Sequence, residues 1–447
     1  MPREGETVVV ETFRRVASTF PWYRTLLDEE GVSPERVGDL AAFGRLCPVL
    51  TKRNTFERFT MPELAATTSL PQLAAVLTSS GHGGRFSFGL TTRAQEEAGA
   101  DAIDHALDVA FGVRTRPTLA INCLPMGVTF ASRCMTVATT SVREDMAVAL
   151  VQAFGAAYAQ VLIVADPLFL KRLTDYAVEQ RLDWRRLRVQ VVVGEEVFGE
   201  HFRRYMAARL GLGRPEEADT FLMSSFGVGE LGLHLCFETR ATVALRRLAC
   251  GYPSFARDLL GHSAPRQGMP MLFAYEPSRT YLEIDQPDAE GFGRLTLSML
   301  DPALPVPLLR YQTGDVARRL DVHEVRQLLG RHGLDVPGAL PTHLIALRGR
   351  EREALPNGAH VSLYKDAVYA ETTVADRLTG AVRVAFDGTE ATAHVQLIRH
   401  CTDDRDVAET LRAALPAHAR PQQVVVWPYE QFPFGMTLDY ERKFAGC

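Results

Sequence analysis

The first 60 residues are predicted to be mainly helical. Between positions 10 and 31, "VETFRRVASTFPWYRTLLDEEG", apolar residues recur every three or four positions, and Gly31 ends the pattern. That spacing puts apolar side chains on one face of a helix, and a terminal glycine is a common stop. We therefore expect a helical segment that packs one face against the rest of the chain.

From about residue 70 onward, strand patterns and helix patterns alternate. Strands are predicted at 73–80, 118–125 and 188–197, and helices closed by a glycine at 93–112 and 199–211. The stretch 147–170 is predicted to be a buried helix followed by a buried strand. Short apolar strands separated by helices are typical of parallel sheets. We therefore predict an α/β fold in layers, with mostly buried parallel strands.

The pattern changes after about residue 270. Short alternating strands, typical of an antiparallel sheet or barrel, are predicted at 280–285, 293–300 and 316–320. Near the end, strands at 381–386, 393–400 and 422–428 accompany one helix at 406–419. This final part has about 100 residues, which suffices for a small α+β domain. We place the domain boundary at "LRGRERE", giving domains 1–348 and 349–447.

Composition and charge exclude several classes of protein. Apolar residues make up 46% and charged residues 23%, and 49 basic against 54 acidic residues give a net charge of −5. A nucleic-acid binder usually carries a basic excess, so none is expected. The seven cysteines form no CxxC pair, which argues against a disulfide framework or a zinc site.

Neither a signal peptide nor a membrane span is predicted. Charged residues interrupt the first apolar stretch of the N-terminus, which a signal peptide would not tolerate. The most apolar region, 147–170, contains Gln152, Gln160 and Asp166. Three polar side chains within one apolar stretch of this length are unfavourable in the interior of a bilayer. We expect a cytoplasmic protein with no membrane partner.

The loop "TSSGHGGRFSFG", at 78–89, follows a predicted strand. Closely spaced glycines let several backbone N–H groups converge, and such a nest binds anions. Ser79 and Ser80 would add hydroxyl donors. The GK[ST] of a Walker loop is missing, so by itself this loop is as compatible with a simple turn as with a phosphate site.

Three further stretches carry candidate chemistry. Glu230 follows an apolar strand in "SSFGVGELG", Asp315 lies in a T-G-D turn predicted between two strands, and Arg350 lies at the domain boundary. Each could be an ordinary turn or surface residue. Together with a phosphate nest, these residues would suit an ATP-binding site. One carboxylate can bridge Mg²⁺ to phosphate, and another can accept hydrogen bonds from the ribose hydroxyls.

In this order and spacing the motifs resemble the adenylate-forming (AMP-binding) superfamily. "TSSGHGGRF" is similar to its [ST]SG[ST][ST]G loop, "SFGVGE" to YGxTE, "RYQTGD" to YRTGD and "GR" at 349–350 to its GRxD hinge motif. The segment "FPWYRTLLDEEGVSPERVGDLAAFGRLCPVLTKRNTF" resembles the phenylacetate–CoA ligase-like branch. The resemblance implies a large N-terminal domain of layered α/β sheets with a β-barrel-like part, followed by a small mobile α+β C-terminal domain.

The resemblance also implies roles for individual residues. Asp315 would bind the ribose diol, Glu230 would hold Mg²⁺, and Arg350 would approach the ribose or phosphate as the small domain rotates. Residues implied at the phosphates are Ser79, Ser80, Gly81, Gly83 and Gly84. Residues implied along the rest of the nucleotide are Gly194, Glu195, Glu196, Ser225, Phe226 and Gly227. Met126, Phe130 and Phe226 could form an apolar slot for the acid, or simply pack in the core.

The sequence departs from this pattern in three places, one of which is Arg352 at the hinge position that the family usually fills with Asp or Lys. His82 and Gly83 replace the hydroxyl pair of the phosphate loop, and Phe86 replaces its proline. The family's catalytic lysine directly follows a glycine near the C-terminus, but here Met436 does, and the nearest lysine is Lys443. Either Lys443 reaches the site, or the general catalyst is lost and Lys443 is a solvated residue. Arg85 and Lys365 are competing candidates.

The implied activity is ATP-dependent activation of a carboxylic acid, with an aryl acid favoured, as an acyl adenylate. Transfer to a thiol would follow, with CoA as the first candidate. Two alternatives stay open: a biosynthetic enzyme that uses a carrier protein or an amine as acceptor, and a degenerate nucleotide-binding homologue. ATP, Mg²⁺ and CoA are the implied cofactors, and relatives in this branch suggest a homodimer.

Overall fold

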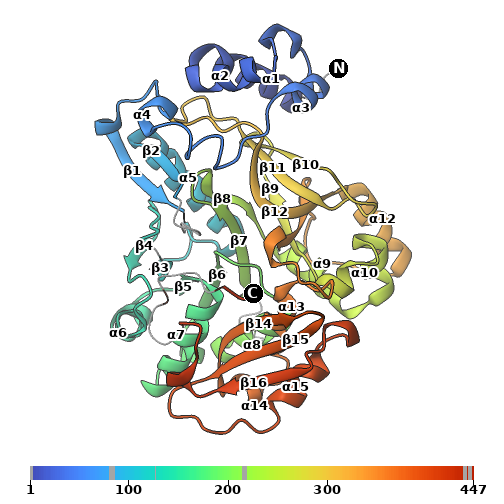
Figure 1. The fold of residues 1–447 in the computed structure, drawn as a ribbon. Coiled ribbons are helices and arrows are strands. Elements are labelled where there is room, and N and C mark those ends of the chain that lie inside the picture. Colours follow the sequence, from blue (N-terminus) through green and yellow to red (C-terminus); the bar gives the residue numbers. More distant parts are fainter. Residues whose placement is uncertain (1–3, 80–85, 126, 214–218, 436–439, 441–444) are drawn as a thin grey trace.

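An eleven-stranded sheet forms the centre of the computed structural model (Figure 1), which describes residues 4–79, 86–125, 127–213, 219–435, 440 and 445–447. Five strands at one end are mutually parallel, and the pairing becomes antiparallel from β7 onward. In spatial order the parallel strands are β4 (Thr136–Thr139), β3 (Thr118–Asn122), β5 (Gln160–Ala165), β6 (Val189–Val193) and β7 (Leu222–Val228). The antiparallel strands continue as β8 (Gly232–Phe237), β9 (Met271–Tyr275), β13 (Leu344–Arg350), β12 (Tyr311–Leu320), β11 (Gly293–Met299) and β10 (Thr280–Asp285).

Helices cover the parallel part of the sheet as the alternating pattern predicts. Strands β3, β5 and β6 are buried along their whole length. The helices of this part are α5 (Arg93–Phe111), α6 (Glu144–Phe154), α7 (Pro167–Glu179) and α8 (Glu200–Leu210). Helix α5 ends at Gly112, whose φ of 66° is the left-handed conformation that glycine adopts without steric cost. The predicted α/β fold class is confirmed.

A second group of helices packs on the antiparallel part. Their apolar side chains form a separate core cluster with residues of β9 and β13, including Leu245, Phe255 and Leu344. These helices are α9 (Arg240–Gly251), α10 (Pro253–Leu260), α11 (Ala264–Gln267) and α12 (Val322–His332). A two-stranded sheet, β1 (Leu73–Thr78) with β2 (Phe88–Thr92), flanks the central sheet.

The N-terminal segment forms several short helices rather than one long one. They are α1 (Glu4–Thr19), α2 (Pro21–Glu29), α3 (Leu40–Leu46) and α4 (Met61–Leu64). Pro21 begins α2 because proline lacks the N–H needed inside a helix but suits its first turn. Leu50 then pairs with β12, through hydrogen bonds of 2.9 Å to Arg310 and Gln312. This pairing brings the residues that follow Leu50 to the central sheet.

The T-G-D sequence is not a turn between two strands. Residues 313–315 lie within β12, where they bulge out of register with β11. Gly314 has a φ of +80°, which the bulge requires and which glycine permits. The prediction of a turn was wrong because a glycine-containing bulge and a turn have the same local composition.

The C-terminal part forms a three-stranded sheet with short helices. Its strands are β14 (Leu378–Asp387), β15 (Glu390–Leu397) and β16 (Gln423–Trp427), and its helices are α13 (Val361–Ala367), α14 (Thr372–Ala375) and α15 (Val407–Ala414). The division at residue 349 stays a prediction, and strand β13, which ends at Arg350, belongs to the large sheet.

Helix α8 lies beside the C-terminal part (Figure 1), and polar contacts join the two. The Asp366 carboxylate accepts hydrogen bonds from the backbone N–H groups of His201 and Phe202, at 3.3 and 2.9 Å. Gly199 makes room for it, because a Cβ there would collide with the Asp366 carboxyl group. At the other end of the helix, Asp376 contacts Arg209 at 2.6 Å. Helix α8 therefore positions the C-terminal part by hydrogen bonds and ion pairs at both of its ends.

Within the described residues, every helix is too short or too polar to cross a bilayer.

Candidate active site

A cavity of about 400 Å³ opens at the carboxyl ends of the parallel strands. Strands β5, β6 and β7, helix α13 and residues 445–447 all contribute to its wall. In open α/β sheets ligands bind outside the carboxyl ends of the strands. The volume also lies in the range of small-molecule sites.

Every predicted site residue that the structure describes lines this one cavity. These residues are Ser79, Phe130, Gly194, Glu195, Glu196, Ser225, Phe226, Gly227, Glu230, Asp315 and Arg350. The structure thus brings together residues that are far apart in the sequence. The other predicted residues lie outside the described ones: Ser80, Gly81, Gly83, Gly84, Met126 and Lys443.

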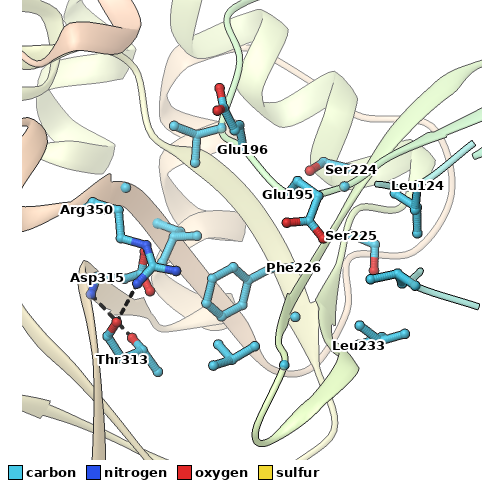
Figure 2. Close-up of a pocket in the computed structure, with 18 of the residues that line it drawn as sticks. Leu124, Glu195, Glu196, Ser224, Ser225, Phe226, Leu233, Thr313, Asp315 and Arg350 are labelled. Carbon is cyan, nitrogen blue, oxygen red and sulfur yellow. Dashed lines mark hydrogen bonds and ion pairs between the residues drawn. The ribbon is translucent and has the colours of Figure 1, made fainter. Parts of the chain in front are cut away.

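Asp315 and Arg350 form one corner of the cavity (Figure 2). They are register partners on β12 and β13, so the antiparallel pairing itself brings them together. Arg350 Nε lies 3.3 Å from Asp315 Oδ1, and the same guanidinium donates a hydrogen bond of 2.6 Å to the Thr313 carbonyl. Asp315 is only 3% exposed. The corner therefore presents a carboxylate and a guanidinium in fixed orientation.

Glu230 belongs to a second polar corner. Its Oε1 accepts a hydrogen bond of 2.6 Å from the Tyr311 hydroxyl and lies 3.8 Å from Lys52 Nζ. Lys52 in turn donates to Ser79 Oγ at 3.1 Å, and Ser79 is held to Ser87 by its backbone. Burial and the Glu230 carboxylate both raise the pKa of Tyr311, which keeps this phenol a donor. The start of the glycine loop is therefore connected to Glu230 through a lysine.

The turn at Gly194 connects the large sheet to the C-terminal part. The Gly194 N–H donates to the Ala165 carbonyl at 3.0 Å, which fixes the turn to the end of β5. Glu196 forms an ion pair of 2.8 Å with Lys365 of α13. Burial lowers the pKa of Lys365, but the carboxylates of Glu196 and Glu353 outweigh burial, so the pKa is raised and the lysine stays charged.

The other end of the cavity is apolar. Its walls come from α5, from the chain after β3, and from strands β5 to β8. The side chains are those of Ile103, Leu107, Leu124, Val128, Phe130, Val164, Val192, Met223 and Leu233. Most of them belong to one core cluster, so this end is a hydrocarbon recess rather than a channel through polar side chains.

Several residues of the cavity were missed or left without a role by sequence reasoning. Lys52 follows "PVLT", within the segment that carried the branch resemblance, and this was the available signal. Thr313, which lines the cavity, and Tyr311, which donates a hydrogen bond to Glu230, lie in the "RYQTGD" motif but were assigned no function. Lys365 was named only as an alternative cation. No sequence signal placed residues 445–447 at the cavity.

Asp166 lies next to the Gly194 turn and is expected to make stability depend on pH. It caps helix α7, and burial, together with the carboxylates of Glu196 and Glu195, raises its pKa to about 7 against the opposing N–H group of Phe169. A raised pKa means that its contribution to stability is fully present below the ordinary value of 3.8 and is lost as the pH rises through 7.

We therefore expect the wild type to lose about 2 kcal/mol more unfolding free energy than Asp166→Asn between roughly pH 5 and pH 8. Asparagine keeps an oxygen acceptor for the cap, so the comparison isolates the charge. Urea unfolding of both proteins across this range measures the difference. Parallel pH profiles would contradict the assignment.

Comparison with known proteins identifies the fold. No protein-family model and no curated protein matches the chain. Among solved structures, a 2-hydroxyisobutyryl-CoA ligase in the postadenylation state with R3-HIB-AMP matches with a TM-score of 0.66 and 14% identity, over 94% of this chain and 85% of that chain. The chain has the adenylate-forming fold. The resemblance inferred from the motifs is thereby confirmed at the level of the fold.

The same ligase offers a second comparison. In its thioesterification state, with 2-HIB-AMP and CoA, it matches with a TM-score of 0.54 and 15% identity, over 96% of this chain and 87% of that chain. This chain is therefore more similar to the postadenylation form than to the thioesterification form.

Proposed function

We propose that this protein is an ATP-dependent acid–thiol ligase that forms an acyl adenylate and transfers the acyl group to CoA. The observation that carries the proposal is the composition of one cavity on an adenylate-forming fold. The Asp315–Arg350 corner and the Glu230–Lys52–Ser79 corner face the same space as the hydrocarbon recess. These surfaces are complementary to a nucleoside triphosphate and to a carboxylic acid with an apolar body.

The chemistry follows from the leaving group. A carboxylate is a poor acylating agent because oxide would have to leave. When a carboxylate oxygen attacks the α-phosphorus of ATP, diphosphate leaves and an acyl adenylate forms. The CoA thiol then attacks the acyl carbon, and AMP leaves. Negative charge builds on the phosphorus oxygens in the first step, so nearby donors and cations lower the barrier.

The residues of the cavity are assigned accordingly. Asp315 accepts the ribose hydroxyls, and Arg350 fixes its orientation and faces the ribose or phosphate. Ser79 begins the phosphate loop, in which Ser80, Gly81, Gly83 and Gly84 would continue the cradle. Ser225, Phe226 and Gly227 of β7, with the Gly194 turn, would lie along the adenosine.

Glu230 fits a magnesium site of the kind that nucleotides need. Mg²⁺ is usually held by one or two carboxylates, with substrate phosphates and water as the remaining ligands. Within the described part of the chain no cluster of three metal-binding side chains occurs, so Glu230 would act as a single carboxylate ligand. Bound there, the ion would neutralise charge on the phosphates.

Pyrophosphate exchange tests the first half of the proposal. Incorporation of labelled diphosphate into ATP, dependent on a carboxylic acid, is expected with at least one acid from a panel of aryl, aliphatic and amino acids, in which aryl acids are the favoured class. Addition of CoA should then produce a thioester. Exchange without thioester formation would indicate a carrier-protein or amine acceptor. ATP binding without any exchange would indicate a degenerate nucleotide-binding homologue.

Asp315→Asn should weaken ATP binding by about 10- to 100-fold, because hydrogen bonds to a charged acceptor contribute roughly 1.5–3 kcal/mol. The side chain keeps its shape and the bulge keeps Gly314, so folding should be little affected. Calorimetric titration with ATP measures the loss. Asp258→Asn, at an exposed ion pair with His332, is the matched control. Unchanged ATP affinity in Asp315→Asn would remove the ribose assignment.

A further inference from the structure

Glu195 occupies a strained turn at the wall of the cavity. Its φ is +72°, a conformation that favours glycine, and the Glu196 N–H donates to the Gly194 carbonyl at 2.9 Å. A bond from residue i+2 back to residue i, with positive φ between them, is the rare and strained form of the γ-turn. Strain of this kind persists where the surrounding structure holds it, and it clusters at ligand sites.

A glycine would fit this position at lower cost. Glycine reaches positive φ without a steric penalty, and the chain uses it at the bulge in β12, at Gly314. The glutamate at 195 therefore adds a side chain where the backbone alone would favour none. A gain from the side chain itself must offset this cost.

The turn sends its two glutamates in opposite directions (Figure 2). Glu196 points away from the Asp315 corner and is neutralised by Lys365. Glu195 points toward Ser225 and Phe226, and it lines the cavity together with Leu124 and the rest of the apolar recess. The Glu195 carboxylate thus lies between the Asp315 corner and the hydrocarbon recess.

The surrounding charges favour a cationic or N–H group at this place. Asp166 lies beside the turn, and the carboxylates of Glu195 and Glu196 act on its ionisation. Lys365 is engaged by Glu196 and lies 4.0 Å from Glu353, so its charge is matched by these two carboxylates. An amino group is the substrate feature that best complements a carboxylate in a cavity that is partly closed to water.

We propose that Glu195 is a specificity-determining residue that accepts a hydrogen bond from an amino group of the acid substrate. The substrate class is then a carboxylic acid with a hydrocarbon body and an amino group. Either an aliphatic α-amino acid with an apolar side chain or an aryl acid with a ring amine supplies this chemistry. The proposal rests on the proposed function and narrows its substrate.

Matched pairs of acids test the proposal. The pairs are phenylalanine with 3-phenylpropanoate, leucine with 4-methylpentanoate, and 4-aminobenzoate with benzoate. In pyrophosphate exchange we expect the amino member of at least one pair to exceed its partner in kcat/KM by ten-fold or more, because a site built for an N–H donor rejects the analogue that lacks it. The first two pairs and the third distinguish the two sources of the amino group. If the members of every pair exchange equally, or the acids without nitrogen exchange faster, the proposal is overturned.

Two variants show whether Glu195 is responsible. Glu195→Gln keeps the size of the side chain and removes its charge, and it should reduce the preference within the pair by about ten-fold. Glu195→Gly should reduce it further while raising the melting temperature, since glycine relieves the turn. If these variants change the KM for ATP, or the preference for ATP over GTP, and leave the ratio of the acids intact, Glu195 contacts the adenine and the proposal is wrong.

Binding measurements separate this proposal from the function on which it rests. Thermal shift with AMP and each acid of a pair reports recognition without chemistry. Absence of exchange with every acid would refute the ligase, and a stabilisation by the amino member that Glu195→Gln abolishes would still support the role of Glu195. Exchange with acids that lack nitrogen, with no effect of Glu195→Gln, would support the ligase and refute the role of Glu195.

Discussion

Glu230→Gln is expected to reduce the rate of acid-dependent pyrophosphate exchange by roughly 10²–10³-fold, the range seen when one group that stabilises transition-state charge is removed. The glutamine keeps the shape of the side chain and can still accept the hydrogen bond from Tyr311. It loses the charge that Mg²⁺ and the phosphates would meet. Because Glu230 is only 2% exposed, water cannot easily replace that charge.

A magnesium titration makes this result specific. The Glu230→Gln variant should need a higher Mg²⁺ concentration for half-maximal exchange and should bind MgATP more weakly. Metal-free ATP should bind equally well or better, because a negative charge beside the phosphates is gone. Glu276→Gln, which alters an exposed carboxylate near Ser278, is the control for charge loss alone. If Glu230→Gln shows the magnesium dependence of the wild type, Glu230 only completes the hydrogen bonds of its corner.

Local patterns in the sequence predicted the elements of the fold well. Strand β6, VQVVV, is buried along its whole length and follows Arg188, and helix α5 has a glycine stop, so a short, mainly apolar run and a helix-ending signal suffice for the two elements. The bulge at Gly314 was predicted as a turn because composition does not say whether the chain continues in the same strand. A register shift depends on the neighbouring strand, here β11, which a local pattern does not contain.

The candidate site was predictable where one motif holds the functional residue. Asp315 and Glu230 follow from short motifs, and both line the cavity. Contacts between distant segments were not predictable, because they depend on how the sheet and the C-terminal part pack. Lys52 contacts Ser79 because the chain at Leu50 pairs with β12 and so lies beside the central sheet. Lys365 reaches Glu196 only because α13 packs near α8.

Lys443 remains the proposed cation of the adenylation step, and residues near it in the sequence contact the rest of the structure. The residue itself lies outside the described part of the chain, but both flanks are placed. Tyr440 packs against Phe169 with ring centroids 5.8 Å apart. Gly446 accepts a hydrogen bond of 2.8 Å from the Val384 N–H, and Ala445 and Gly446 line the cavity. In the sequence, Ala445 follows Lys443 by two residues, and this is the basis on which Lys443 is proposed.

Lys443→Ala should therefore lower the adenylation rate by about 10²–10³-fold, the effect of removing one positioned cation from the transition state. Thioester formation from a preformed acyl adenylate should be spared, because the charge on the α-phosphate no longer has to be created by attack of the acid. Single-turnover measurements of each half-reaction give the two rates separately.

Lys365→Met is the comparison that decides between the two lysines. Lys365 is held by Glu196 and Glu353, and its loss leaves both carboxylates without their shared cation. We expect that variant to melt at a lower temperature and to slow both half-reactions, since α13 would dock less firmly on the large domain. If Lys365→Met instead abolishes adenylation alone and Lys443→Ala leaves it intact, the catalytic cation is Lys365. If Lys443→Ala slows both half-reactions equally, Lys443 contributes to the packing of the tail and not to the chemistry.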